Sequence, residues 1–562
     1  MVLKTREAFT PKDYRQTQKV AIKSNGNNEE DLSRPLIGIA NTYGEGIAGH
    51  HHFRELVDYL RRGIYRAGGY TSEFGSIAAC DAMAAGGRIS NNYVLPTRGV
   101  IADSIELMAR AHRYDGLVIM ASCDKIVPAA LMAAARLDIP CIILLGGTML
   151  TGTTFNGKKA DLSTFTEARG QLQLGKITRE TYEALSDLVC PTCGSCQFYG
   201  TANTMCCVTE ALGMTLPGSG LIPAPYIDKW RDATAIGETI VKMVYEGITA
   251  REIMTLEALK NAIMVSMATG ASTNVILHLM AIAHELEYEA DEIMPLFNYY
   301  NDRIPLIVKT NPAADYDMVD FYEAGGIPRV MQILKDSLYL DCMTVTGRTI
   351  GENLDSYVFK YPINDDIIHP LDKAYYPTGG LVIMKGNLAP ETAVAKPSGI
   401  LPEIRKFRGP AIVFNSEEEC GQAIQEGKVV PGHVVVIRYE GPKGGPGMRE
   451  MVVPLKVLKG RGLLTQVALI SDGRFSGTNN GCFVGHISPE AAEGGPLAVV
   501  RDGDIISIDT DEKRELNIEI SEEELAMRLR EWKYVPKEAK VTGYMARYIK
   551  GVKSAAKGAI LD

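Results

Sequence analysis

The sequence lacks the features that would favour a membrane or nucleic acid as a partner. No run of about 18 or more apolar residues occurs in the 562-residue chain, which argues against a membrane-spanning helix. The formal net charge of −9 leaves no basic excess, so we expect no binding to nucleic acid or to an anionic membrane. The first residues are charged and contain no apolar segment of the secretory type, which favours a cytoplasmic protein.

The sequence also lacks an even set of cysteines, internal repeats and low-complexity tracts. Its 11 cysteines form no set that pairs completely, and no secretory signal accompanies them, so a disulfide framework is not expected. Several of them fall in one short stretch, residues 190–207. Metal ligation would explain some of the cysteines, and the others fit small, buried apolar side chains.

The first 370 residues alternate short apolar runs with helical patterns. Residues 36–41, 116–122 and 141–147 are apolar and end in small or polar residues, as buried strands do. Strands that alternate with helices predict a parallel sheet with helices on both faces, which is an α/β domain. Residues 200–350 are predicted to be mostly helical, with an interruption at Gly270.

The composition changes near residues 360–380. Beyond this point short β-type runs are separated by Gly, Pro and Asp, which indicates a β-rich domain of barrel or sandwich type. We therefore expect an α/β domain over residues 1–370 and a barrel-like domain over residues 371–562.

Two Cys–Asp pairs are the most informative chemical feature. Cys80 precedes Asp81, and Cys123 precedes Asp124 at the end of a predicted strand, where ligands of parallel sheets gather. A soft thiolate beside a hard carboxylate, found twice, predicts iron–sulfur and Mg²⁺ ligands close together. A further cysteine, Cys196, lies in the polar segment CGSCQFYGTANTM.

Long segments of the chain resemble the family of dihydroxy-acid dehydratase, phosphogluconate dehydratase and the related sugar-acid dehydratases. The resemblance runs nearly from end to end. The segments that carry it are LPTRGVIADSIE (95–106), CDKIVPAALMAAARLDIP (123–140), GTANTMCCVTEALGMTLPGS (200–219), EAGGIPRVMQIL (323–334), TVTGRTIGENL (344–354), KGNLAPETAVAK (385–396), YEGPKGGPGMRE (439–450) and SDGRFSGTNNGCFVGHISPEAAEGGPLAVVRDGD (471–504).

The resemblance implies that Cys123 and Cys196 bind an iron–sulfur cluster. The family's third cysteine has no direct counterpart here, because Gly49 stands at that place and glycine cannot ligate iron. Cys80 and Cys193 are the two substitutes, with Cys190 a weaker one. We favour Cys80, because its neighbour Asp81 must already approach the site, and this choice favours a 4Fe–4S over a 2Fe–2S cluster.

The resemblance also implies a magnesium site. Asp81, Asp124 and Glu450 would contribute carboxylates, and Lys125 matches the lysine that family members carry as a carbamate. Mg²⁺ requires hard oxygen ligands, and an unmodified ammonium beside it would repel it.

The base is expected to be Ser476, in the glycine-rich segment DGRFSGTNNG, with Thr478 close by. By the resemblance, this serine acts as an alkoxide that takes the proton from C2 of the substrate. Because free serine is a very weak base, metal charge would have to lower its pKa.

Three consecutive histidines, residues 50–52, invite a metal-site interpretation. Adjacent histidines on one element cannot all point at one ion, so a hydrogen-bonding or surface role is favoured.

The resemblance implies a hydro-lyase that dehydrates a small 2,3-dihydroxy carboxylate to a 2-keto acid. Gly49 and Cys80 favour a sugar acid (aldonate) as the substrate. The alternatives are the dihydroxy acid of branched-chain amino-acid biosynthesis and a catalytically silent relative that binds a sugar acid. A homodimer or homotetramer is also implied by the resemblance.

Overall fold

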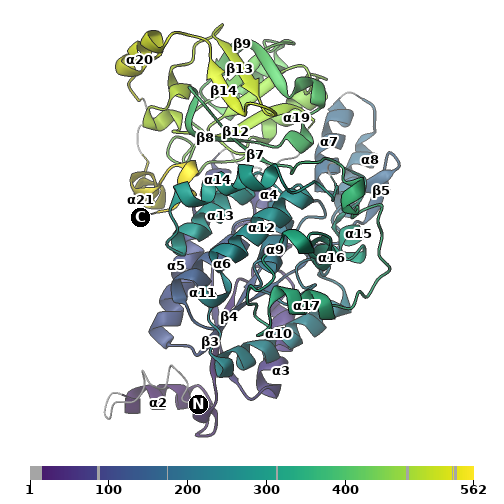
Figure 1. Ribbon diagram of the computed structural model, residues 1–562, viewed down its shortest axis with the longest axis vertical. Helices are drawn as coiled ribbons and strands as arrows, with labels where there is room; N and C mark the ends of the chain where they lie inside the picture. The colour runs from purple at the N-terminus through teal and green to yellow at the C-terminus, as the bar shows by residue number, and fades with distance from the viewer. Residues whose placement is uncertain are drawn as a thin grey trace.

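The computed structural model describes residues 15–84, 89–173, 175–311, 314–475, 480–534, 536 and 541–561 (Figure 1). An N-terminal α/β part with a parallel sheet lies beside a C-terminal part built around a closed barrel. The predicted fold class is therefore confirmed. No described helix combines the length and the apolar character needed to cross a membrane.

The N-terminal sheet contains four parallel strands among the described residues, in the order β2-β1-β3-β4. Strands β1, β3 and β4 are buried along their whole length and match the predicted apolar runs. Strand β2 is an edge strand with polar, half-exposed residues, which is why its pattern did not reveal it. The strands are β1 (Leu36–Asn41), β2 (Tyr70–Gly75), β3 (Gly116–Ala121) and β4 (Cys141–Leu145).

Helices cover the sheet. Helix α3 (Phe53–Arg66) packs closely against α10 (Ile227–Glu246) because glycines meet at their contact. A Cβ atom on Gly63 would lie 2.0 Å from the Thr234 carbonyl oxygen, so a larger residue would force the helices apart. Helices α5 (Thr97–His112) and α6 (Ile126–Leu137) form a second packed pair, and α6 contacts β3 and β4.

A helical region follows, as predicted. Helix α12 (Leu256–Thr269) ends at Gly270, whose positive φ of 62° suits glycine, and α13 (Asn274–Glu285) begins soon after. The other helices of this part are α2 (Arg15–Ser24), α4 (Asp81–Ala84), α9 (Thr201–Ala211), α11 (Ala250–Ile253), α14 (Ala290–Asn301), α15 (Met318–Glu323), α16 (Gly326–Ile333) and α17 (Ile350–Ser356).

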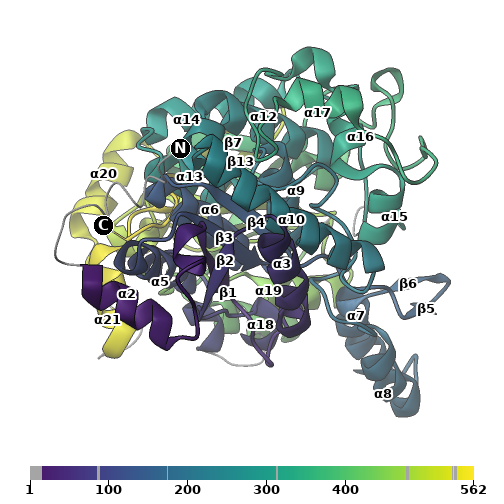
Figure 2. The same ribbon diagram turned by 90° about the horizontal axis from the view of Figure 1, so that it is seen from below.

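A small arm projects from the N-terminal part (Figure 2). It is built from a two-stranded antiparallel sheet and two helices around a small apolar cluster of its own. Its elements are β5 (Thr153–Phe155), β6 (Lys158–Ala160), α7 (Leu162–Gln173) and α8 (Arg179–Leu188).

The C-terminal barrel closes in the order β10-β11-β12-β8-β7-β14-β13-β9. It rests on α14, where the Asn298 side chain exchanges two hydrogen bonds of 2.8 Å with the backbone of Ile383. The strands are β7 (Val382–Gly386), β8 (Ala389–Ala395), β9 (Lys406–Phe414), β10 (Val434–Ile437), β11 (Ala468–Ser471), β12 (Cys482–Ser488), β13 (Ile505–Asp509) and β14 (Glu515–Ile518). The helices of this part are α18 (Glu417–Gln425), α19 (Val452–Gly460), α20 (Glu522–Glu531) and α21 (Gly543–Gly551).

Candidate metal-dependent active site

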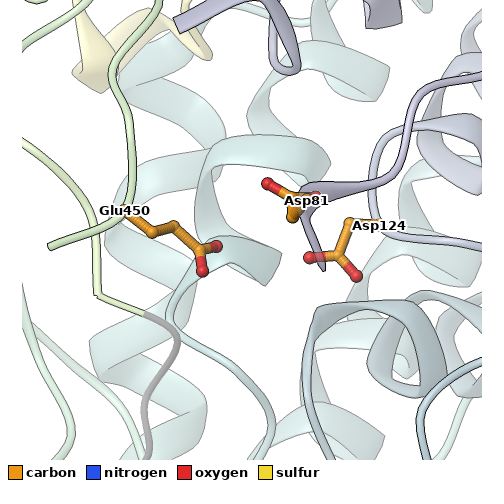
Figure 3. Close-up of side chains that lie close together, drawn as sticks. All are labelled: Asp81, Asp124 and Glu450. Atoms are coloured by element: carbon orange, nitrogen blue, oxygen red, sulfur yellow. The ribbon is translucent and has the colours of Figure 1, made fainter. Parts of the chain in front are cut away.

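Three carboxylates from distant parts of the chain converge between the two parts of the molecule. Asp124 follows β3, Asp81 begins α4, and Glu450 belongs to the loop that precedes α19. Each contributes an oxygen that lies within 4.8 Å of the other two (Figure 3). The fold therefore brings the predicted magnesium ligands together, although their spacing along the chain does not predict that they are close.

The Lys125 side chain is fully buried among these acids. Its Nζ lies 3.0 Å from Asp81 Oδ2, 3.3 Å from Asp124 Oδ2 and 4.0 Å from Glu450 Oε1. Burial and Arg474 lower the pKa of Lys125, but the three carboxylates outweigh them and the net pKa lies above its usual value. As an ammonium, Lys125 is thus the counter-ion of the acids. A divalent cation beside it would need that positive charge to be removed.

Burial has a large effect on one of the acids, Asp124. It raises the pKa of Asp124 to about 6, and the neighbouring charges of Asp81 and Glu450 act in the same direction. A carboxylate that is costly to ionise is stabilised when a cation binds it. Perturbed pKa values of this kind cluster at functional sites.

Glu450 is oriented by two buried side chains. Asn274 Nδ2 donates to Glu450 Oε1 over 2.6 Å, and Arg474 Nη1 donates to the same oxygen over 3.1 Å. The Arg474 side chain is fully buried, and its Nη2 has no partner among the described residues. These two residues were not singled out from the sequence. Arg474 lies inside a segment that carries the resemblance, whereas Asn274 has no signal beyond its place in a helical region.

The thiols of Cys80 and Cys123 are hydrogen-bonded to one another beside the acids. This bond is the main reason why the pKa of Cys80 falls to about 7 and why the pKa of Cys123 rises well above its usual value. Cys196 lies close enough to both to interact with them electrostatically, and burial raises its pKa. The structure therefore brings together the three cysteines that were predicted to bind a cluster.

The alternative cysteines have different surroundings, although the charge of Cys190 contributes to the raised pKa of Cys196. Cys193 is half-buried, and the charged side chain that acts on it is Glu55 rather than a site residue. Cys190 is exposed, and its sulfur lies 3.9 Å from Gln197 Nε2. This geometry supports Cys80 over Cys193 as the third ligand.

Gly49 faces the thiols directly. A Cβ atom built on it would lie 2.6 Å from Cys123 Sγ and 3.4 Å from Ser122 Oγ. Position 49 therefore points at the place where the family's usual cysteine would act, and in this chain it adds space instead of a ligand.

The three histidines do not converge. His50 is buried and donates from Nδ1 to the Thr42 carbonyl oxygen over 2.8 Å, while His52 Nε2 bonds the Gly146 carbonyl oxygen over 2.8 Å. His51 is exposed. Two of them thus support the strand ends through backbone hydrogen bonds, as the hydrogen-bonding interpretation expected.

The predicted base and its neighbour, Ser476 and Thr478, lie outside the described residues. The chain enters that segment from Arg474 and Phe475, and Arg474 is the residue that bonds Glu450.

The donor atoms of the site suit two kinds of metal. Three carboxylate oxygens around one point are the hard ligands that Mg²⁺ prefers, and burial raises the pKa of Asp124, a cost of ionisation that a bound cation would offset. Adjacent thiols, one of them with a lowered pKa, suit the iron of an iron–sulfur cluster. The residues present therefore fit both groups.

Comparisons with known proteins identify the class. Residues 34–353 match the dihydroxy-acid/6-phosphogluconate dehydratase N-terminal family, and residues 366–559 match the C-terminal family of the same name. The chain belongs to the dihydroxy-acid/6-phosphogluconate dehydratase family and is a hydro-lyase.

Curated relatives cover nearly the whole chain. A dihydroxy-acid dehydratase of Caldanaerobacter subterraneus subsp. tengcongensis is 49% identical over 95% of each chain. That of Pyrococcus furiosus is 48% identical over 96% of each chain, and that of Acetivibrio thermocellus is 46% identical over 98% of each chain.

Proposed function

We propose that the protein dehydrates a 2,3-dihydroxy-3-methyl carboxylate of branched-chain amino-acid biosynthesis to the corresponding 2-keto acid. One observation carries the chemistry: three carboxylates, a buried lysine and hydrogen-bonded thiols meet in a single site between the two parts of the molecule. The choice of substrate is supported by relatives of 46–49% identity that are named dihydroxy-acid dehydratase. They favour the second candidate of the sequence analysis over the aldonate.

The cofactors follow from the donor atoms. An iron–sulfur cluster on Cys80, Cys123 and Cys196 would supply a Lewis acid for the leaving hydroxyl, and Mg²⁺ on Asp81, Asp124 and Glu450 would stabilise developing negative charge. Three cysteine ligands would leave one iron open in either cluster type, and we favour 4Fe–4S over 2Fe–2S because Cys80 precedes Asp81 much as in the C-D-G motif of the phosphogluconate and some sugar-acid dehydratases.

The protein's own groups have separate tasks. Asn274 and Arg474 fix the orientation of Glu450, so the acids are positioned before a ligand arrives. Lys125, as a carbamate, would become a fourth oxygen ligand in place of a competing cation. Burial alone would favour the neutral amine that carbamate formation requires, but the three carboxylates raise the pKa of Lys125 above its usual value, so a cation that neutralises them would favour the modification.

The proton is removed from C2 by Ser476 in this proposal, and the 3-hydroxyl leaves as water. The resulting enol takes a proton at C3 and becomes the 2-keto acid, so that atoms balance without an oxidant or reductant. What supports Ser476 is its position directly after Arg474 and Phe475, because Arg474 contacts Glu450. Thr478 lies two residues further on.

The test is a substrate comparison. Protein purified and loaded with iron and sulfide under anaerobic conditions, with Mg²⁺ present, is assayed for 2-keto acid formation. We expect a higher kcat/KM for 2,3-dihydroxy-3-methylbutanoate than for a pentonate or a hexonate. A higher value for an aldonate would overturn the choice of substrate, and a protein that keeps its cluster but converts none of these acids would overturn the proposed reaction.

A further inference from the structure

Arg449, the residue before Glu450, is buried and is held on the opposite side of the chain. Its guanidinium contacts acids of α18 and of its own loop, whereas the Glu450 side chain contacts Asn274 and Arg474. Glu450 pairs with Arg474 in a β-bridge, and successive side chains of an extended chain point to opposite sides. Contacts that fix Arg449 therefore also fix the backbone from which the Glu450 side chain projects.

Two glutamates bind the Arg449 guanidinium with two hydrogen bonds each. Nη1 and Nη2 donate to the two carboxylate oxygens of Glu418 over 2.7 and 2.6 Å. Nε and Nη2 donate to those of Glu440 over 3.0 and 2.9 Å. A third acid, Glu417, has its Oε2 3.4 Å from Nε. Paired bonds of this kind fix the plane of the guanidinium as well as its position, which a lysine could not provide.

The acids are themselves anchored. Glu417 and Glu418 belong to the first turn of α18, and the Glu417 N–H donates to Glu440 Oε1 over 3.0 Å. Glu440 is fully buried, and its own N–H donates to Asp472 Oδ1 over 2.8 Å. Asp472 lies two residues before Arg474, which forms the β-bridge at the end of the loop. The loop is therefore tied to one segment at both of its ends.

The turn that leads into Arg449 is strained. Gly447 and Met448 have positive φ angles of 85° and 49°. This region suits glycine but is unfavourable for a residue with a side chain, and it persists where the surrounding structure enforces it. The Met448 carbonyl oxygen accepts a hydrogen bond of 2.5 Å from Arg474 Nε, and the bonds of Arg449 hold the chain just beyond the turn.

We propose that Arg449 is a positioning residue for the metal site, because its bonds to Glu418 and Glu440 hold Glu450 where it meets the other two carboxylates. The proposal rests on the proposed function, since it concerns a Mg²⁺ ligand of that site. If these bonds are weakened, the turn at Met448 can relax and the Glu450 carboxylate loses its fixed place. The metal must then order this ligand as it binds, and that ordering costs affinity.

The competing explanation is that Arg449 only neutralises buried acids. In that case its replacement lowers the stability and the amount of folded enzyme, but each folded molecule binds the metal normally. A positioning residue instead changes the metal affinity of the folded molecules. Metal affinity, measured directly, therefore separates the two explanations.

Arg449→Lys is the first variant, because lysine keeps the charge but lacks the planar fork that binds two carboxylates. Cluster-loaded, Mg²⁺-free protein is titrated anaerobically with Mn²⁺, and the free Mn²⁺ is measured from its EPR signal. We expect the Kd for Mn²⁺ to rise about 10-fold. The Mg²⁺ concentration for half-maximal activity should rise in parallel, whereas kcat at saturating Mg²⁺ should change less than about 2-fold.

Glu418→Gln is the second variant. The Glu418 side chain is 42% exposed, so this replacement is tolerated more easily than one at a buried position. Because Glu440 keeps its bonds to Arg449, we expect a smaller rise in the Kd for Mn²⁺, of about 3-fold. This variant gives the answer if Arg449→Lys does not fold.

Arg528→Lys is the matched control. Arg528 is also buried and also binds two carboxylates, with bonds of 2.6 and 3.2 Å to Asp504 and 2.7 Å to Glu524. It belongs to α20, and its partners are not residues of the site. The variant should lose stability as Arg449→Lys does, yet keep the wild-type Kd for Mn²⁺.

A wild-type Kd for Mn²⁺ in the folded Arg449 and Glu418 variants would overturn the proposal, whatever happens to their thermal stability. An equal rise in Arg528→Lys would also overturn it, because the effect would then follow from the loss of any buried arginine. A wild type that binds no Mn²⁺ would instead overturn the metal site itself. The substrate of the proposed function is judged separately, by which acid the wild type converts, so the failures are distinguishable.

Discussion

The two Cys–Asp pairs have the same sequence but different surroundings. Cys123–Asp124 directly follows a fully buried strand and precedes α6, whose first residues Ile126 and Val127 are buried. Cys80–Asp81 lies on a segment whose neighbours Ile77 and Met83 are 51% and 70% exposed. The core thus positions one pair in advance. The other pair is held mainly by the site itself, through the Cys80–Cys123 hydrogen bond and the ion pair between Asp81 and Lys125.

Cysteine replacements test this comparison with the largest expected effect. Cys80→Ser, Cys123→Ser and Cys196→Ser should each lose the cluster, with activity reduced by at least about 1,000-fold. Cys193→Ser should keep both. Iron content, visible absorption and EPR spectra are the measurements. If Cys193→Ser bleaches the protein and Cys80→Ser does not, the choice of the third ligand is wrong.

The cluster-free protein sharpens the same comparison. Because Cys80 is half-exposed and Cys123 is buried in the core, Cys123→Ser should lower the unfolding free energy by about 1 kcal/mol or more, whereas Cys80→Ser should change it by less than about 0.5 kcal/mol. Denaturant titration measures both values. Equal losses would mean that the two segments are equally anchored.

Asp81→Asn and Asp124→Asn come next in expected size. Each removes one of three oxygen ligands, so the Mg²⁺ concentration needed for half-maximal activity should rise by at least about 10- to 100-fold. Asp103→Asn is the control, since this surface acid pairs with Arg136 away from the site. A normal Mg²⁺ requirement in either site variant would remove that residue from the ligand set.

Gly49→Ala should disturb the Cys123–Asp124 pair, with a smaller effect than the loss of a metal ligand. The added methyl group would lie 2.6 Å from Cys123 Sγ, so the thiol or the backbone must move. We expect partial loss of iron, measured as the iron-to-protein ratio after anaerobic loading. Gly46→Ala is the control, because no atom lies within 4 Å of the Cβ that it would gain. Full iron content in Gly49→Ala would show that the thiol or the backbone can move to accept the methyl group without loss of iron binding.

The last prediction concerns stability at acid pH. Burial lowers the pKa of His50 to about 4, so the unfolded chain binds a proton that the folded protein does not. Stability should therefore be lost as the pH falls from about 6.5 to 4, by about 1–3 kcal/mol from this residue. His50→Asn keeps a donor near the Thr42 carbonyl oxygen and should flatten the dependence of Tm on pH. An unchanged dependence would exclude His50 as a contributor.

Local patterns were sufficient for much of the fold. Strands β1, β3 and β4 are continuous apolar runs, and Gly270 ends α12 as its sequence indicated. Strand β2 was not predicted from the sequence, because an edge strand needs no apolar face on its outer side. The projecting arm was not predicted either, because its short elements bury only a small apolar cluster of their own and so have weak hydrophobic patterns.

The site was predictable only in part, for a physical reason. Strand ends indicated Cys123 and Asp124, and the resemblance to a family indicated Asp81 and Glu450. The contacts that orient Glu450 depend on how the barrel docks against the helices, and no local pattern encodes that docking. The role of Asn274 became visible only when distant segments were seen side by side.

The buried lysine among the three acids has a consequence for the protein before it is loaded. Without a neutralising partner, three negative charges in the interior would push the sheet and the barrel apart. Lys125 supplies that partner from within the chain, and Arg474 shares the task through Glu450. A newly made chain can therefore close its two halves first and exchange its internal cation for an external one later.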